Sequence, residues 1–296
     1  LEELEAALAE LKGTDDAVVF GSGYLTNLGV IPTLMRPGDL IVLDELSHAC
    51  IHAGTRLSGA EIRVFRHNDL EHAREHFDGA RGDHDRALLV TDGVFSMDGD
   101  VAPIEALADM AEHYDAWLMT DDAHGIGVLG EGKGSAHAQG CADRVPLQMG
   151  TLSKAIGSYG GYLCASRPVI DWLKSRARPL VYSTGLPPAA AAASLAALRI
   201  IEREPELCAT PVRRAARFAE ALGLPDPESC IVPILLGEPE RALAASEVLE
   251  REGFLVTAIR PPTVPKGTAR LRITFTAGHD EADVDRLAHI VKTEVL

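Results

Sequence analysis

Residues 145–157 read VPLQMGTLSKAIG, a short apolar run followed at once by small residues around a single lysine, Lys154. A short apolar run of this kind is typical of a buried strand. Six further runs share that character: Ala17–Phe20, Leu40–Leu43, Ile62–Phe65, Ala87–Val90, Trp117–Thr120 and Tyr162–Ala165. Because the runs alternate with helical patterns, the sequence predicts an α/β fold with a mostly parallel sheet and helices on both faces.

The pattern changes after a long helix that an alanine-rich stretch predicts from Pro188 to Glu204. Before it, helices are expected at Tyr24–Met35, Asp69–Ala80 and Pro103–Tyr114. After it, strands are expected at Ile231–Leu236, Leu255–Ile259 and Leu271–Thr276, with helices at Glu240–Glu252 and Glu281–Val295. We therefore expect a large domain over residues 1–190 and a small carboxyl-terminal α/β domain over residues 191–296.

Composition excludes several classes of protein. The 28 basic and 44 acidic residues give a formal charge of −16, which argues against a general affinity for nucleic acid or an anionic membrane. The most apolar stretch, Ala189–Leu198, is shorter than the roughly 20 residues of a membrane span. The five cysteines are scattered and form no Cys-x-x-Cys pair, so we expect buried thiols in a reducing compartment, the cytoplasm.

Polar residues follow the predicted strands, where the loops of open α/β sheets supply ligand sites. Gly21-Ser22-Gly23-Tyr24 opens a helix whose amino end can receive a phosphate on backbone N–H groups. His48 closes the loop after the second run, and Ser96 lies in the loop after the fourth. Asp121-Asp122-Ala123-His124-Gly125 puts two carboxylates and an imidazole on one loop, which could equally be a metal site of a hydrolase.

Lys154 is the candidate nucleophile. It stands among small residues after a predicted buried strand, so we expect it to be poorly solvated. Desolvation lowers the pKa of an amine toward the neutral form that attacks an aldehyde. An ordinary surface lysine is the competing interpretation, and the non-helical, weakly polar flanks disfavour it.

A nucleotide-binding protein and a catalytically inactive subunit are weaker interpretations. Residues 127–133, GVLGEGK, come close to a nucleotide-binding P-loop, but that motif requires Ser or Thr next, and Gly134 stands there. A regulatory subunit that has kept the fold and lost the chemistry would not be expected to retain Lys154, Asp121, His48 and His124 together.

The chain resembles the α-oxoamine synthases, pyridoxal 5′-phosphate (PLP) enzymes of fold type I that condense an amino acid with an acyl thioester. The resemblance extends from Leu4 to about Leu287. Its most specific motifs are Asp121-Asp122-Ala123-His124-Gly125, Thr151-Leu152-Ser153-Lys154 and Tyr182-Ser183-Thr184-Gly185-Leu186-Pro187-Pro188.

The resemblance implies a cofactor site. Lys154 is expected to hold PLP through a Schiff base, Asp121 to pair with the pyridinium nitrogen and His48 to stack on the ring. Further contacts are implied to the phenolic edge by Ser96 and His124, and to the phosphate by Gly23, Tyr24 and Thr151. Ser183 and Thr184 are expected to reach the phosphate of a neighbouring subunit, which implies a homodimer with shared sites.

The resemblance also bears on substrates. Ala258–Pro265 is most similar to the member of the family that uses L-alanine and a pimeloyl thioester; glycine or serine with another acyl group remain alternatives. His48, Thr263 and Arg272 are the expected substrate-binding residues, with Arg272 as a fork for the carboxylate. The acyl carrier, coenzyme A or a carrier protein, stays open. The family's amino-terminal arm, which helps line the substrate entrance, is expected to be absent from this chain.

Overall fold

The computed structural model describes residues 1–296, which form two compact units. The first comprises residues 1–95 and 101–205, and the second comprises residues 96–100 and 206–296. This division falls later in the chain than the expected domain limit of 190, because helix α9 (Pro188–Arg203) packs against α1 (Glu2–Lys12) inside the first unit.

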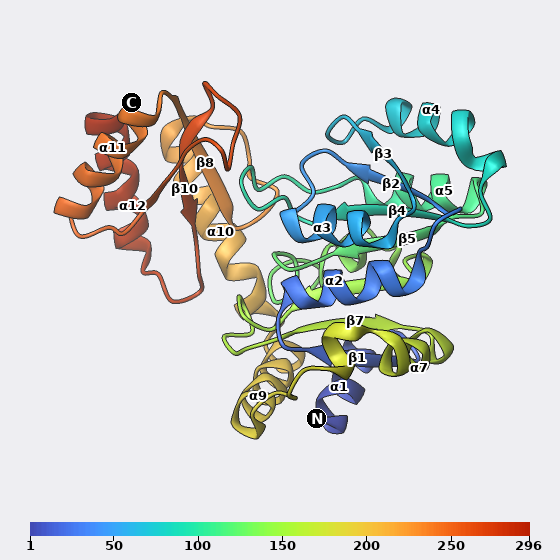
Figure 1. The fold of residues 1–296 in the computed structure, drawn as a ribbon. Helices are drawn as coiled ribbons and strands as arrows, with labels where there is room; N and C mark the ends of the chain where they lie inside the picture. Colours follow the sequence, from blue (N-terminus) through green and yellow to red (C-terminus); the bar gives the residue numbers. More distant parts are fainter. The chain divides into compact units, whose positions relative to one another are not determined.

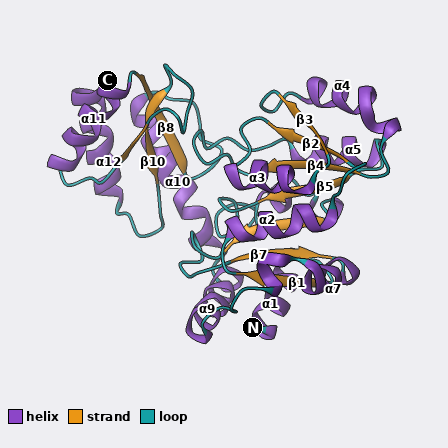
Figure 2. Cartoon of the chain, viewed as in Figure 1, coloured by secondary structure: helices purple, strands orange, loops and turns teal.

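The first unit is built on a seven-stranded sheet (Figures 1 and 2). Its strands are β1 (Asp16–Phe20), β2 (Leu40–Asp44), β3 (Glu61–Phe65), β4 (Ala87–Asp92), β5 (Trp117–Asp121), β6 (Leu147–Thr151) and β7 (Gly161–Ala165). Their order is β1-β7-β6-β5-β4-β2-β3, and β7 alone runs antiparallel to its neighbours. The predicted α/β class and mostly parallel sheet are confirmed.

Helices cover both faces of this sheet. They are α1, α2 (Gly23–Leu34), α3 (Ala49–Ser58), α4 (Leu70–Ala80), α5 (Ile104–His113), α6 (Ser135–Ala138), α7 (Arg167–Arg176), α8 (Arg178–Val181) and α9. Successive strand residues point to opposite faces, so Ile41 and Leu43 join the core beneath α2 and α3, whereas Leu40 and Val42 join the core beneath α4 and α5. Full burial of each such side chain contributes about 1.5–3 kcal/mol.

The sheet positions the candidate site. Strands β2, β4, β5 and β6 are parallel, and β1 shares their direction. Their carboxyl ends therefore meet at one edge, and the polar loops singled out in the sequence follow these ends. None of the helices is both long and apolar enough to cross a membrane.

The second unit holds a three-stranded antiparallel sheet in the order β8-β10-β9, formed by β8 (Ile231–Gly237), β9 (Thr257–Ile259) and β10 (Ala269–Thr274). Its helices are α10 (Pro205–Leu222), α11 (Pro239–Arg251) and α12 (Glu281–Ile290), with a π-helical turn at Val291–Val295. The segment 96–100 belongs here because Ser229 Oγ donates to the Gly99 carbonyl at 2.6 Å and Arg270 pairs with Asp98.

Candidate active site

Asp121 ends β5 at the carboxyl edge of the sheet, and its side chain is only 5% exposed. Its Oδ2 accepts a hydrogen bond from Asn27 Nδ2 at 2.7 Å, and its Oδ1 accepts one from the Ala123 N–H at 3.1 Å. Burial raises the pKa of Asp121, whereas the Asn27 hydrogen bond and the positive charge of Lys154 act to lower it. Asp121 is thus a buried carboxylate whose contacting donors are both neutral.

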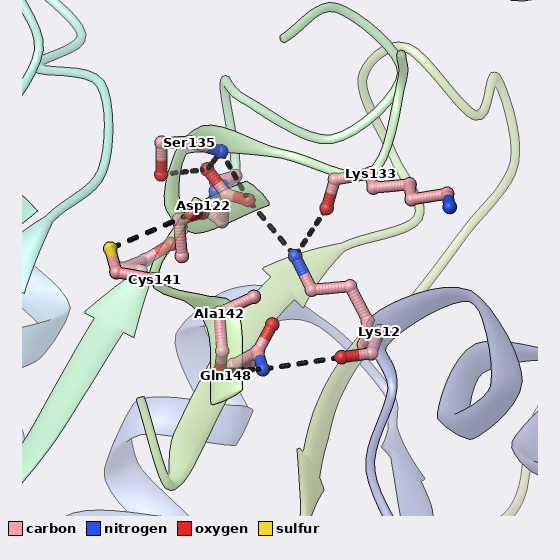
Figure 3. A network of polar contacts seen from close by, with 10 residues as sticks. Lys12, Asp122, Lys133, Ser135, Cys141, Ala142 and Gln148 are labelled. Carbon is pink, nitrogen blue, oxygen red and sulfur yellow. Dashed lines mark hydrogen bonds and ion pairs between the residues drawn. The ribbon is translucent and has the colours of Figure 1, made fainter. Parts of the chain in front are cut away.

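Asp122 has a different environment (Figure 3). It forms an ion pair with Lys12 at 3.1 Å, both side chains being 1% exposed, and accepts hydrogen bonds from the Ser135 hydroxyl at 2.6 Å and the Ser135 N–H at 3.1 Å. Gly134 lies so close that a Cβ there would stand 1.6 Å from Asp122 Oδ2. Asp122 therefore connects α1, which carries Lys12, with the end of β5 and the start of α6.

This arrangement argues against a P-loop and against a metal site. Gly134 is glycine because it lies against Asp122, and residues 123–134 form turns rather than the strand, loop and helix of a P-loop. No group of three or more His, Cys, Asp or Glu side chains lies in an arrangement that could hold a metal ion, and Asp121 and Asp122 have separate sets of partners.

His48 caps the amino end of α3. The Cys50 N–H donates to His48 Nδ1 at 3.3 Å, and the His48 N–H donates to Asp92 Oδ1 at 3.2 Å at the end of β4. His48 itself is exposed. Asp92 is buried, and burial together with the charge of Asp121 raises its pKa well above the usual value. The cap therefore fixes His48 beside the two buried acids of the sheet edge.

Lys154 follows β6 in a tight turn closed by hydrogen bonds from the Leu152 N–H to Gly160 O at 2.9 Å and from the Ser158 N–H to Leu152 O at 2.8 Å. Lys154 is exposed, so the expectation that its small neighbours bury it is wrong for this chain. The turn projects the residue outward from the strand end. Lys154 follows the carboxyl end of β6, and Asp92 and Asp121 end the parallel strands β4 and β5 of the same sheet. The positive charge of Lys154 acts to lower the pKa values of both acids.

Gly23 and Tyr24 begin α2, where the first N–H groups have no partner within the helix. A Cβ on Gly23 would lie 3.4 Å from Thr151 Cβ and 3.3 Å from Met149 Cε, so the start of the helix adjoins the end of β6. Thr151 Oγ1 donates to Gly160 O at 2.8 Å. The helix start and Thr151 thus form one cradle of the kind that binds a phosphate.

The other predicted residues are divided between the two units. Ser183 and Thr184 are exposed between α8 and α9, and His124 is half-buried in the turn after β5. Ser96, Thr263 and Arg272 belong to the second unit, where Arg272 Nε donates to the Ser96 carbonyl and Thr263 is exposed. Burial lowers the pKa of Arg272.

Sequence reasoning missed three contacting residues. Asn27 connects Asp121 with Cys50, whose sulfur lies 3.1 Å from Asn27 Nδ2, and Asp92 binds the backbone of His48. Asn27 carries a visible signal, because a buried asparagine within an apolar helix requires a polar partner. Cys50 carries none, since a buried cysteine usually behaves as a small apolar residue.

A protein-family model and the sequence of a bacterial enzyme both match nearly the whole of this chain. The family described as "Aminotransferase class I and II" matches residues 1–291. The 8-amino-7-oxononanoate synthase of Methylocella silvestris is 61% identical over 292 residues, which are 99% of this chain and 83% of the relative.

Two solved structures share the fold. A serine palmitoyltransferase variant from S. paucimobilis with a bound PLP–myriocin aldimine is 32% identical, with a TM-score of 0.91 over 98% of this chain and 75% of that one. The 8-amino-7-oxononanoate synthase from Francisella tularensis is 26% identical, with a TM-score of 0.84 over 99% of this chain and 86% of that one.

Proposed function

We propose that this chain, which belongs to the aminotransferase class I and II family and within it to the α-oxoamine synthases, joins L-alanine to a pimeloyl thioester with loss of carbon dioxide. The product would be 8-amino-7-oxononanoate, and the role would lie in biotin synthesis. The cofactor of the enzyme is PLP. The observation that carries the proposed chemistry is the buried Asp121 carboxylate, which accepts hydrogen bonds from the neutral donors Asn27 and Ala123 and whose pKa the charge of Lys154 acts to lower.

The residues fit PLP. The cradle of Gly23, Tyr24 and Thr151 suits its phosphate, and Asp121 is a buried anion suited to its pyridinium nitrogen. A cation held beside Asp121 would offset the burial that raises its pKa, so carboxylate and pyridinium would stabilise each other. When bound, PLP withdraws electrons from the Cα of the amino acid.

We assign Lys154 two tasks, to bind the cofactor covalently and to remove the proton from the alanine Cα. The proposal rests on the place of Lys154 in the turn after β6, at the carboxyl edge of the sheet that also carries Asp121. His48 would cover the ring face, and His124 and Ser96 would contact its phenolic edge.

Arg272 would receive the substrate carboxylate. Its Nε bond to the Ser96 carbonyl fixes the plane of the guanidinium, and its partial burial leaves that charge poorly solvated, so an incoming carboxylate would be bound firmly. Thr263 would line the same substrate. Ser183 and Thr184, exposed on their segment, would bind the phosphate held by a second copy in a cytoplasmic homodimer, which sedimentation of the holoenzyme tests.

The decisive experiment compares two lysine substitutions. Lys154→Ala should abolish product formation and the visible absorbance of the lysine-bound cofactor. Lys133→Ala is the matched control, since its side chain lies on the P-loop-like segment and its carbonyl, which accepts from Lys12, would remain. If Lys154→Ala keeps full activity, the proposal is wrong; if Lys133→Ala alone is inactive, the nucleotide-binding interpretation returns.

Substrate choice needs a separate test. Carbon dioxide release should be measured with L-alanine, glycine and L-serine, each with pimeloyl-coenzyme A and with the pimeloyl carrier protein. L-alanine should give the highest kcat/KM with at least one carrier. Preference for glycine or serine would make the chain an α-oxoamine synthase of different specificity.

A further inference from the structure

We propose that Cys50 is a positioning residue that holds the imidazole of His48 in the tautomer with its proton on Nε2. The role of His48 at the cofactor rests on the proposed function, whereas the tautomer is a property of the chain alone.

The first argument is the helix cap. His48 Nδ1 lies 3.3 Å from the Cys50 backbone nitrogen, and a backbone N–H can only donate. Nδ1 must therefore accept, which in a neutral imidazole leaves the proton on Nε2. The backbone of α3 therefore makes Nδ1 an acceptor, which leaves Nε2 as the donor.

The second argument is the thiol. Cys50 Sγ lies 2.8 Å from His48 Nδ1, and the residue is 2% exposed. Burial, reinforced by the charge of Asp121, raises the pKa of Cys50 to about 12, so the thiol keeps its proton at neutral pH. An S–H group is thus available to donate to the same Nδ1 that the backbone already requires to accept.

Asn27 contacts the same thiol. Its Nδ2 donates to Cys50 Sγ at 3.1 Å and to Asp121 Oδ2 at 2.7 Å. The sulfur accepts from Asn27, so its own S–H remains available for the contact with His48 Nδ1. One buried polar chain therefore connects the carboxylate at the sheet edge with the exposed imidazole.

The consequence concerns what His48 can offer a bound molecule. With Nδ1 occupied by Cys50, the ring presents Nε2–H on its opposite side, as a donor and never as an acceptor. His48 would then donate to a substrate oxygen and would not remove a proton, which leaves proton abstraction to Lys154.

The test reads the tautomer directly. The chain labelled with ¹⁵N-histidine is studied at neutral pH by two-bond ¹H–¹⁵N correlation, before and after loading with PLP, and His48→Gln identifies the signal. The parent should show the Nε2–H form. Cys50→Ala should move the tautomer ratio toward Nδ1–H by about fivefold, as expected for one lost hydrogen bond.

Matched variants separate positioning from packing. Cys50→Ser keeps a donor and should retain the parental tautomer ratio and most of kcat, whereas Cys50→Ala should lower kcat severalfold with PLP binding unchanged. Cys141→Ala, at another buried cysteine, should change neither. An Nδ1–H form in the parent, or an unchanged ratio in Cys50→Ala, would overturn the proposal. Since the chain without PLP already gives the tautomer, this result does not depend on which substrates the enzyme uses.

Discussion

Asp121 and Asp122 are neighbours at the end of β5, yet the surroundings of their carboxylates are opposite in kind. Successive residues at a strand end point to opposite sides. The charge of Asp122 is matched by the buried Lys12 at 3.1 Å and by Ser135, whereas Asp121 is contacted only by the neutral donors Asn27 and Ala123. The charge of Asp122 is thus compensated by a buried lysine, whereas the cation that we propose to pair with Asp121 belongs to the cofactor.

The difference between the two environments distinguishes a structural acid from a candidate functional acid. A buried carboxylate that has its own buried lysine contributes to structure, because removing either partner strands the other charge. A buried carboxylate without a cation is costly to the folded chain, and such a cost usually persists where function requires it. Substitutions at the two positions should therefore affect different properties.

The largest expected effect is on stability. Asp122→Asn leaves the Lys12 ammonium buried without its counter-charge, so the free energy of unfolding should fall by about 3–5 kcal/mol. Urea denaturation of the chain without PLP measures it. Adding Lys12→Met to Asp122→Asn removes the stranded charge and should recover part of the loss. A fall below about 1 kcal/mol would mean that the pair is weakly coupled.

The next effect is on catalysis. Asp121→Asn keeps the size and one acceptor oxygen, which can serve either Asn27 or the Ala123 N–H but not both, and it removes the charge that we propose holds a proton on the pyridine nitrogen. Exchange of the L-alanine α-proton in D₂O, followed by NMR, should fall at least a hundredfold, on the order of 3 kcal/mol. PLP should still bind through Lys154 and the phosphate cradle, and the free energy of unfolding should change less than in Asp122→Asn, because one hydrogen bond is lost and no buried cation is left unpaired. Exchange at the parental rate would contradict the assignment of Asp121 as the partner of the pyridine nitrogen.

The same contrast shows what the sequence could predict. Seven apolar runs sufficed to predict the strands of a mostly parallel sheet and the polar residues that follow them, because buried strands appear in a sequence as short apolar runs. The order of the strands and the antiparallel direction of β7 were not predicted, since they depend on pairing between distant parts of the chain. The motif alone could not separate Asp121 from Asp122. The distinction depends on Lys12, which is far away in the sequence and reaches the motif only in the folded chain.

The sequence also failed to predict two helices, α3 and α10, and the contact between α2 and α3. Helix α3 was not predicted, since its sequence ACIHAGTRLS contains a glycine and β-branched or hydroxyl residues that form helices poorly. Gly54 is explained by packing, because a Cβ there would lie 2.6 Å from the Asn27 carbonyl of α2. This close approach brings Cys50 and Asn27 together. Helix α10 was also missed, and Pro205 and Pro211 interrupt its pattern.

The smallest expected effect is a pH-dependent change in the free energy of unfolding when Asp92 is replaced. Burial and the charge of Asp121 raise the pKa of Asp92 above the unfolded value of 3.8, so the folded chain is penalised when this group ionises. Below pH 3.8 the group is protonated in both states and the penalty is absent; as pH rises through the folded pKa, stability is lost. Asp92→Asn keeps an oxygen that can accept from the His48 N–H and should raise the free energy of unfolding at neutral pH.

That gain should shrink toward zero as pH falls to 3.8, which urea unfolding of the chain without PLP at a series of pH values measures. Asp226→Asn, at an exposed carboxylate, is the control and should change stability little at any pH. The sign is opposite to that of Asp122→Asn, since removing an uncompensated buried charge relieves a cost and removing a compensated one creates it. A loss of stability in Asp92→Asn at neutral pH would contradict the assignment of Asp92 as an uncompensated buried acid.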